Sequence, residues 1–157
     1  MTREEKFMEA AIALAEKGIE HNEGGPFGCV IVKDDKIIGR GNNKVTSTND
    51  PTAHAEIIAI REACKHLDSF QLQDCEIYTS CEPCPMCLGA IYWARPKVIY
   101  YGNTRKDAAK IGFDDSMIYD EIGSDLSTRK IPVINICREK ANLTFIEWQQ
   151  KKDKKMY

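Results

Sequence analysis

The sequence reads Pro51-Thr52-Ala53-His54-Ala55-Glu56 in one place and Cys81-Glu82-Pro83-Cys84-Pro85-Met86-Cys87 in another, and these two stretches carry its metal-binding pattern. Cys84 and Cys87 have the C-x-x-C spacing, which points both sulfurs to the same side when it opens a helix. The free N–H groups at a helix start help to hold such sulfurs as thiolates. Pro85 suits the first helical turn, where a missing N–H costs little.

The imidazole of His54 brings the number of predicted metal ligands to three. Three protein ligands leave the fourth tetrahedral position open for water, which is the catalytic rather than the structural arrangement of zinc. Glu56 lies two residues after His54 and could face the open side of the metal, where a general acid/base takes a proton from water. The order H-x-E followed by P-C-x-x-C is the signature of zinc-dependent nucleobase deaminases.

Other interpretations of the cysteines stay open at this point. C-x-x-C alone could be a redox motif or half of a structural zinc site. A redox role leaves His54 and Glu56 unexplained. Cys81 could be a fourth ligand and close the site, and a non-catalytic zinc-binding module is a further alternative, although Glu56 and all three ligands are present.

Length and composition favour one globular domain spanning residues 1–157, with 43% hydrophobic and 29% charged residues. No apolar run reaches the roughly 18 residues that a membrane span needs, and no apolar segment follows the first residues as in a secretory signal. We therefore expect a cytoplasmic protein. An odd total of seven cysteines argues against a disulfide scaffold. The net charge of −2 favours a small-molecule ligand over a nucleic acid.

Around the two stretches, hydrophobic periodicity predicts strands that alternate with helices, and hence a layered α/β domain with some parallel pairing. Thr2 and Glu5 form a capping-box pattern at the start of the first helix. Further helices are expected at 53–66, 86–94, near 116 and at 143–152. Strands are expected at 27–32, 37–41, 76–79, 98–101 and 132–136, and residues 103–125 otherwise read as irregular.

The segments Asp50–Glu56 and Thr79–Ala90 resemble the cytidine deaminase-like superfamily, in its branch of guanine deaminases and tRNA adenosine deaminases. The resemblance extends from end to end, through residues 24–28, 92–96 and 112–116 to the terminal Tyr157. It implies a three-layer α-β-α fold with a mixed β-sheet and one Zn²⁺ per subunit. It also implies a homodimer in which the C-terminal segment, about residues 130–157, is swapped between subunits, with no membrane partner.

Similarity to the guanine deaminases implies a guanine aminohydrolase of purine catabolism, which converts guanine to xanthine and ammonia. In that reaction zinc-activated water attacks C2 of guanine, and Glu56 protonates the ring nitrogen and helps to expel ammonia. Asp115 matches an acid that assists the second proton transfer, although it could simply cap the helix near 116. The alternatives are a tRNA adenosine deaminase, which makes inosine, and a deaminase of guanosine or another amino-purine.

The resemblance also implies a set of substrate contacts: Asn43, Phe27, Ala55, Trp93 and Tyr157. Asn43 would contact the base, Phe27 would stack on it, and the backbone amide of Ala55 would line the site. Tyr157 would cap the pocket of the partner subunit. Each has a structural alternative, because Asn43 could be a turn residue, Phe27 and Trp93 could pack in a core or interface, and a terminal tyrosine could be frayed.

Overall fold

The computed structural model describes residues 1–157, which divide into two compact units, Met1–Asp115 and Ser116–Tyr157. The first unit contains a four-stranded sheet in the order β2-β1-β3-β4. Its strands are β1 (Gly28–Lys33), β2 (Lys36–Asn42), β3 (Glu76–Cys81) and β4 (Val98–Asn103). β1 pairs antiparallel with β2 and β3, whereas β3 and β4 are parallel, so the predicted mixed sheet is confirmed.

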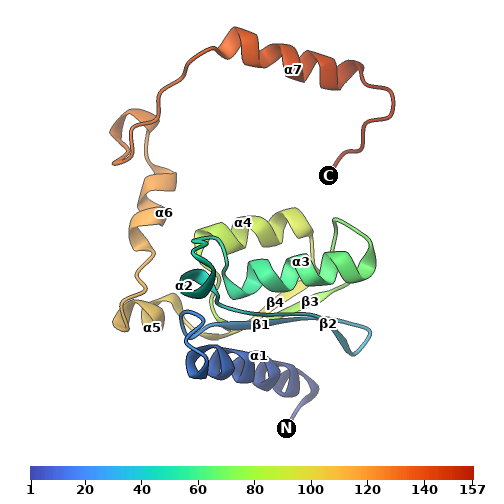
Figure 1. The fold of residues 1–157 in the computed structure, drawn as a ribbon, viewed down its shortest axis with the longest axis vertical. Helices are drawn as coiled ribbons and strands as arrows, with labels where there is room; N and C mark the ends of the chain where they lie inside the picture. Colours follow the sequence, from blue (N-terminus) through green and yellow to red (C-terminus); the bar gives the residue numbers. More distant parts are fainter. The chain divides into compact units, whose positions relative to one another are not determined.

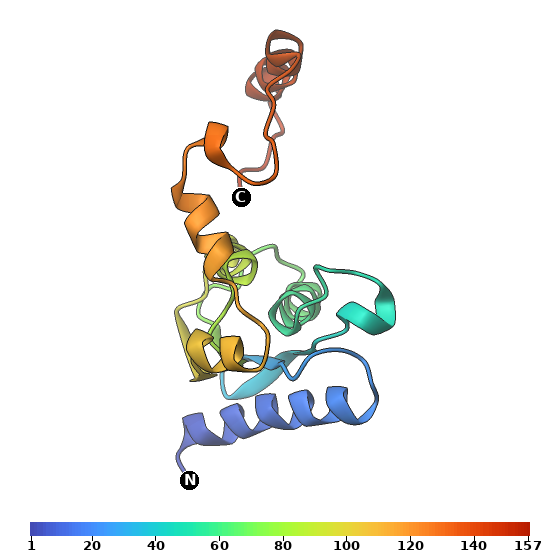
Figure 2. The same cartoon turned by 90° about the vertical axis from the view of Figure 1, so that its left-hand side faces the viewer.

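Helices cover both faces of this sheet, as Figures 1 and 2 show. α1 (Arg3–Glu20) lies on one face, and α3 (Ala55–Leu67) and α4 (Pro85–Ala94) lie on the other. Side chains alternate along each strand, so each face has its own core. The α1 side buries Ala11, Val30, Val32 and Tyr78, and the α3/α4 side buries Cys29, Ile31, Ala59, Ile77 and Ile91. The α-β-α layering expected from the resemblance is therefore confirmed.

The first helix begins where the sequence predicts. The Thr2 hydroxyl accepts a hydrogen bond from the Glu5 N–H, and the Thr2 N–H donates to the Glu5 carboxylate. This reciprocal pair is a capping box, which satisfies two backbone donors that the helix cannot use itself. The local signal was sufficient to place the start of α1 without any knowledge of the tertiary fold.

The start of α3 lies against the backbone of β2. A Cβ atom placed on Gly41 would lie 2.1 Å from the carbonyl oxygen of Ala55 and 2.8 Å from the amide nitrogen of Ala59. Only glycine allows this close approach, and the small side chains of Ala55 and Ala59 complete it. The contact fixes the N-terminal end of α3, and with it His54, against the sheet.

Two short helices form in stretches that the sequence analysis left irregular. They are α2 (Val45–Thr48) and α5 (Arg105–Lys110). α5 begins with a second capping box, in which Thr104 accepts from the Asp107 N–H and Asp107 accepts from the Thr104 N–H. That pattern was present in the sequence and was missed. No helix in the chain has both the length and the apolar character needed to cross a membrane.

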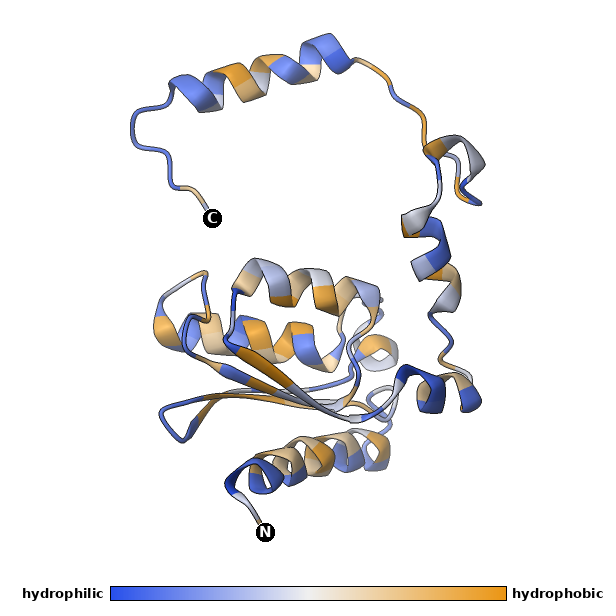
Figure 3. Ribbon diagram, turned by 180° about the vertical axis from the view of Figure 1, so that it is seen from behind, coloured by the Kyte–Doolittle hydropathy of each residue, from blue (hydrophilic) through white to orange (hydrophobic).

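The second unit contains α6 (Ser116–Gly123), the 3-10 turn η1 (Leu126–Thr128) and α7 (Arg138–Gln150). The two predicted helices are present, although α7 starts at 138 rather than 143. The predicted strand at 132–136 is wrong for this chain, because these residues pair with no strand. Hydrophobic positions recur among hydrophilic ones along α7 (Figure 3), yet no residue of the unit is buried.

Candidate metal centre

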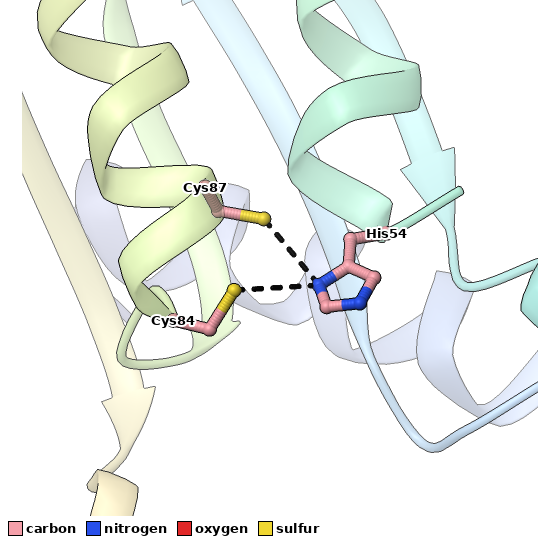
Figure 4. Close-up of side chains that lie close together, drawn as sticks. All are labelled: His54, Cys84 and Cys87. Atoms are coloured by element: carbon pink, nitrogen blue, oxygen red, sulfur yellow. Dashed lines mark hydrogen bonds between the residues drawn. The ribbon is translucent and has the colours of Figure 1, made fainter. Parts of the chain in front are cut away.

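Three side chains meet between the N-terminal ends of α3 and α4. His54 is the N-cap residue of α3, Cys84 is the N-cap residue of α4, and Cys87 lies in the first turn of α4. The sulfurs of Cys84 and Cys87 are each 3.5 Å from Nδ1 of His54 (Figure 4). All three possible ligand atoms lie within 4.8 Å of one another. The fold thus brings together the trio that the sequence pattern predicts.

The electrostatics around these three side chains favour the thiolate form of cysteine and the binding of a metal cation. Both helices direct their positive ends toward these side chains. The pKa of Cys84 is lowered to about 4, chiefly by a hydrogen bond from Cys87 and further by His54. The same hydrogen bond raises the pKa of Cys87. Two sulfurs and one imidazole nitrogen are the donor set of catalytic zinc with one tetrahedral position left for water, so the residues present fit that metal.

Cys81 does not belong to this group, although the spacing left that possibility open. Its buried sulfur lies 3.8 Å from the carbonyl oxygen of Thr104. Burial raises the pKa of Cys81 to about 11, so its sulfur stays a thiol at neutral pH. The group of ligand atoms therefore has three members, which favours the open, catalytic arrangement over a closed four-ligand site.

Glu56 is the second residue of α3, and only 6% of its surface is exposed. Its Oε1 accepts a hydrogen bond of 2.9 Å from the hydroxyl of Thr79. Burial raises the pKa of Glu56 above its usual range, with hydrogen bonds, among them one from Cys87, acting in the opposite direction. A carboxyl group that shares a hydrogen bond with Cys87, and that holds a proton more readily than usual, is suited to general acid/base chemistry.

Asn43 is almost completely buried just after β2. Its Oδ1 accepts hydrogen bonds from the N–H groups of Gly25 and Val45, at 3.2 and 3.1 Å. These two contacts fix the orientation of the amide and leave its Nδ2 group as a donor. The Val45 contact is also an Asx turn, so the turn role weighed for Asn43 is real as well. The Asn43 N–H donates to the carbonyl oxygen of Phe27, which holds these two predicted contacts side by side.

Phe27 meets Phe113 edge to face, with ring centroids 5.0 Å apart and an interplanar angle of 83°. A Cβ atom on Gly25 would lie 3.0 Å from the Phe27 ring and 3.1 Å from the Phe113 ring, so glycine leaves room for both. Phe27 also packs against the core on the α3/α4 side, as its structural alternative predicted. Sequence analysis used Phe113 only as part of the resemblance over residues 112–116 and did not select it as a site residue.

The remaining predicted site residues are less closely grouped. Ala55 opens α3, where the helix itself does not use its N–H. Asp115 is half-buried; burial raises its pKa, and the negative charge of Cys84 adds to the rise. Trp93 is 62% exposed on α4, and Tyr157 belongs to the second unit and is 70% exposed.

Residues 1–103 match the family model of the cytidine and deoxycytidylate deaminase zinc-binding region. The chain belongs to this zinc deaminase family. Zinc is accordingly its cofactor, in agreement with the donor set described above.

Relatives of this zinc deaminase include enzymes for two kinds of substrate. This chain is 54% identical to guanine deaminase of Bacillus subtilis over 153 residues, which is 98% of each chain. The X-ray structure of guanine deaminase from that organism matches with a TM-score of 0.95 over 98% of both chains. A tRNA-specific adenosine deaminase of Buchnera aphidicola is 37% identical over 86% of this chain and 89% of its own length.

Proposed function

We propose that this chain hydrolyses guanine to xanthine and ammonia, with zinc held by His54, Cys84 and Cys87 and the proton carried by Glu56. The observation that carries the proposal is the buried Glu56 carboxyl group, which shares a hydrogen bond with Cys87 of the ligand trio. Identity of 54% over 98% of the chain to a guanine deaminase favours the free base over tRNA, because tRNA adenosine deaminases reach only 46% over 64% or 37% over 86% of the chain.

Zinc, when bound, lowers the pKa of a water molecule and so supplies the nucleophile of the hydrolysis. Glu56 accepts a proton from the attacking water and delivers it to the ring nitrogen beside the carbon under attack. A second proton then reaches the leaving amine, which departs as ammonia, and Asp115 assists this transfer. Asn43 donates through Nδ2 to an acceptor on the base, the Ala55 N–H lines the pocket, and Phe27 stacks on the ring.

Replacing Glu56 by glutamine tests this mechanism. We expect E56Q to retain its zinc and to release ammonia from guanine at least about 10³-fold more slowly than wild type, because the amide cannot carry the proton. Zinc content and ammonia release are measured on the same preparation. Unchanged turnover would remove Glu56 from the mechanism. Ammonia release from tRNA or guanosine, but not from guanine, would show that guanine is not the substrate.

We also propose that residues 1–157 form one deaminase domain that is completed in a homodimer, with about residues 130–157 exchanged between subunits. The first unit supports this, because β4 is an edge strand and a groove of about 330 Å³ runs beside it. The groove is lined by Glu4, Glu5, Met8, Tyr78, Ile99, Tyr100 and Tyr101. The second unit has exposed apolar residues at 131, 134, 136 and 145 that could cover such a groove.

Cytoplasmic residence stays a prediction from the sequence.

Mixing two inactive variants tests the exchange. One chain carries E56Q, and the other lacks Tyr157 but keeps Glu56. If Tyr157 closes the site of the partner, the mixed dimer has one complete site, and activity appears after the two are refolded together. If each chain closes its own site, every site in the mixture keeps a defect and no activity returns. Each variant refolded alone is the control.

A further inference from the structure

The hydroxyl group of Thr79 lies beside Glu56 in the interior of the first unit. Thr79 is 1% exposed in β3, where its backbone pairs with Cys29 of β1 on one side and with Tyr101 of β4 on the other. Its Oγ1 is 2.9 Å from Oε1 of Glu56 and 3.0 Å from the carbonyl oxygen of Cys81. A side chain on a strand paired at both edges is a rigid support for a catalytic group.

The hydroxyl has one proton and two acceptors, so it donates to one of them at a time. An ionised carboxylate is the stronger acceptor, and the proton therefore points to Oε1 of Glu56. Oε1 is then occupied as an acceptor. This contact fixes the rotation of the carboxyl group, to which Cys87 also donates. The Cys81 carbonyl gives the hydroxyl a second partner close by, which keeps its oxygen in place.

We propose that Thr79 is the positioning residue of Glu56, whose hydroxyl holds Oε1 and so fixes the orientation in which the carboxyl group moves the proton. This inference rests on the proposed role of Glu56 as proton carrier. Thr79 contacts the carboxyl group rather than the substrate, and its effect belongs to the chemical step. Removing the hydroxyl should therefore lower kcat, whereas binding of guanine and of zinc should remain.

Ser80 offers a matched control one residue further along β3. It is also buried, at 6% exposure, and its hydroxyl oxygen accepts a 3.0 Å hydrogen bond from the Gly28 N–H. Successive side chains on a strand point to opposite faces, so Ser80 points away from Glu56. Its removal costs a buried hydrogen bond without touching the proposed proton carrier.

The experiment compares T79V, T79S and S80A as zinc-loaded enzymes in steady-state deamination of guanine. Valine has nearly the shape of threonine without its hydroxyl. We expect T79V to lose about 10- to 100-fold in kcat while KM stays within about twofold and zinc remains bound. T79S restores the hydroxyl and should recover kcat to within about threefold. S80A should lower Tm but leave kcat unchanged.

Wild-type kcat in T79V, a T79S as slow as T79V, or a loss confined to KM each overturns the proposal. Should T79V fail to fold, T79A replaces it with the same expectations, and loss of zinc from both variants shows a purely structural role. E56Q is measured in parallel. If E56Q is inactive while T79V is fully active, only the inference about Thr79 fails. If E56Q itself keeps wild-type turnover, the proposed role of Glu56 as proton carrier fails, and the inference about Thr79 fails with it.

Discussion

The two units of the chain differ in what they bury. The first unit buries side chains on both faces of its sheet, including Ile31 and Ile77 on one side and Val30 and Tyr78 on the other. The second unit buries none, and Phe145, for example, is 73% exposed. Helices in water owe most of their stability to packing of an apolar face. The first unit therefore holds the metal ligands through its own core, whereas the second unit leaves its large apolar side chains exposed.

The largest expected effect concerns the metal centre of the first unit. C87S should lose its zinc on dialysis, and turnover of guanine should fall by at least about 10³-fold, because a serine hydroxyl is a poor substitute for a thiolate ligand. Zinc content and ammonia release measure both effects. C81S is the matched control, since the Cys81 sulfur lies apart from the three ligand atoms, and it should keep its zinc. Zinc loss in C81S but not in C87S would contradict the ligand assignment.

The next effect concerns the exposed apolar side chains of the second unit. F145E places a charge on α7, and if a second copy covers this helix, the dimer should dissociate and turnover should fall about tenfold or more. Sedimentation velocity and ammonia release measure the two effects. K140E changes the charge of the same helix without removing an apolar group, and it should remain dimeric. An F145E protein that is dimeric and fully active would show that no copy covers Phe145.

The same difference explains how far the sequence predicted the fold. In the first unit, the Thr2–Glu5 capping box agrees with the start of α1, and the continuous β-rich run at 27–32 agrees with β1, which is buried on both faces. The predicted strand at 132–136 was wrong because apolar β-branched residues become a strand only beside a free edge. That information is absent from the segment itself.

Some residues of the candidate site could be predicted from the sequence, and others could be found only from the fold. His54 and Glu56 are two residues apart, and Cys84 and Cys87 three, so a local pattern was sufficient to find them. The contact between Thr79 and Glu56 joins residues 23 positions apart on a strand and a helix. In the sequence Thr79 was only a strand residue. Its role could be inferred only once the fold had brought the two side chains together.

Packing within the first unit predicts a smaller, thermodynamic effect. G41A should lower the free energy of unfolding by about 3 kcal/mol, because the new Cβ atom would lie 2.1 Å from the Ala55 carbonyl oxygen and force α3 away from β2. G89A is the control, since a Cβ atom there meets nothing within 4 Å. It should raise stability by about 0.5–1 kcal/mol, as alanine does in an open helical position. Urea unfolding measures both, and equal effects would contradict the packing argument.

The smallest effect depends on pH and on the opposite face of the first unit. Glu76 is 7% exposed and accepts hydrogen bonds from Lys97 at 2.9 Å, Arg3 at 2.8 Å and Tyr78 at 2.7 Å. Burial raises the pKa of Glu76, but these bonds outweigh it and lower the pKa to about 2. A carboxyl group with a lowered folded-state pKa stabilises the fold above its unfolded pKa of about 4.3, and this contribution is lost as pH falls toward 2.

E76Q measures that contribution. Arg3 and Lys97 are partly exposed, which screens their charges, so we expect wild type to exceed E76Q by about 2 kcal/mol in free energy of unfolding at pH 7. About half of this difference should be lost by pH 3, because below about pH 4.3 the unfolded chain takes up a proton on Glu76 while the folded state still keeps the carboxylate ionised. A difference that stays constant from pH 7 to pH 3 would contradict the lowered pKa. The second unit has no buried carboxyl group of this kind. Through Glu76, acid should therefore lower the stability of the first unit and not that of the second.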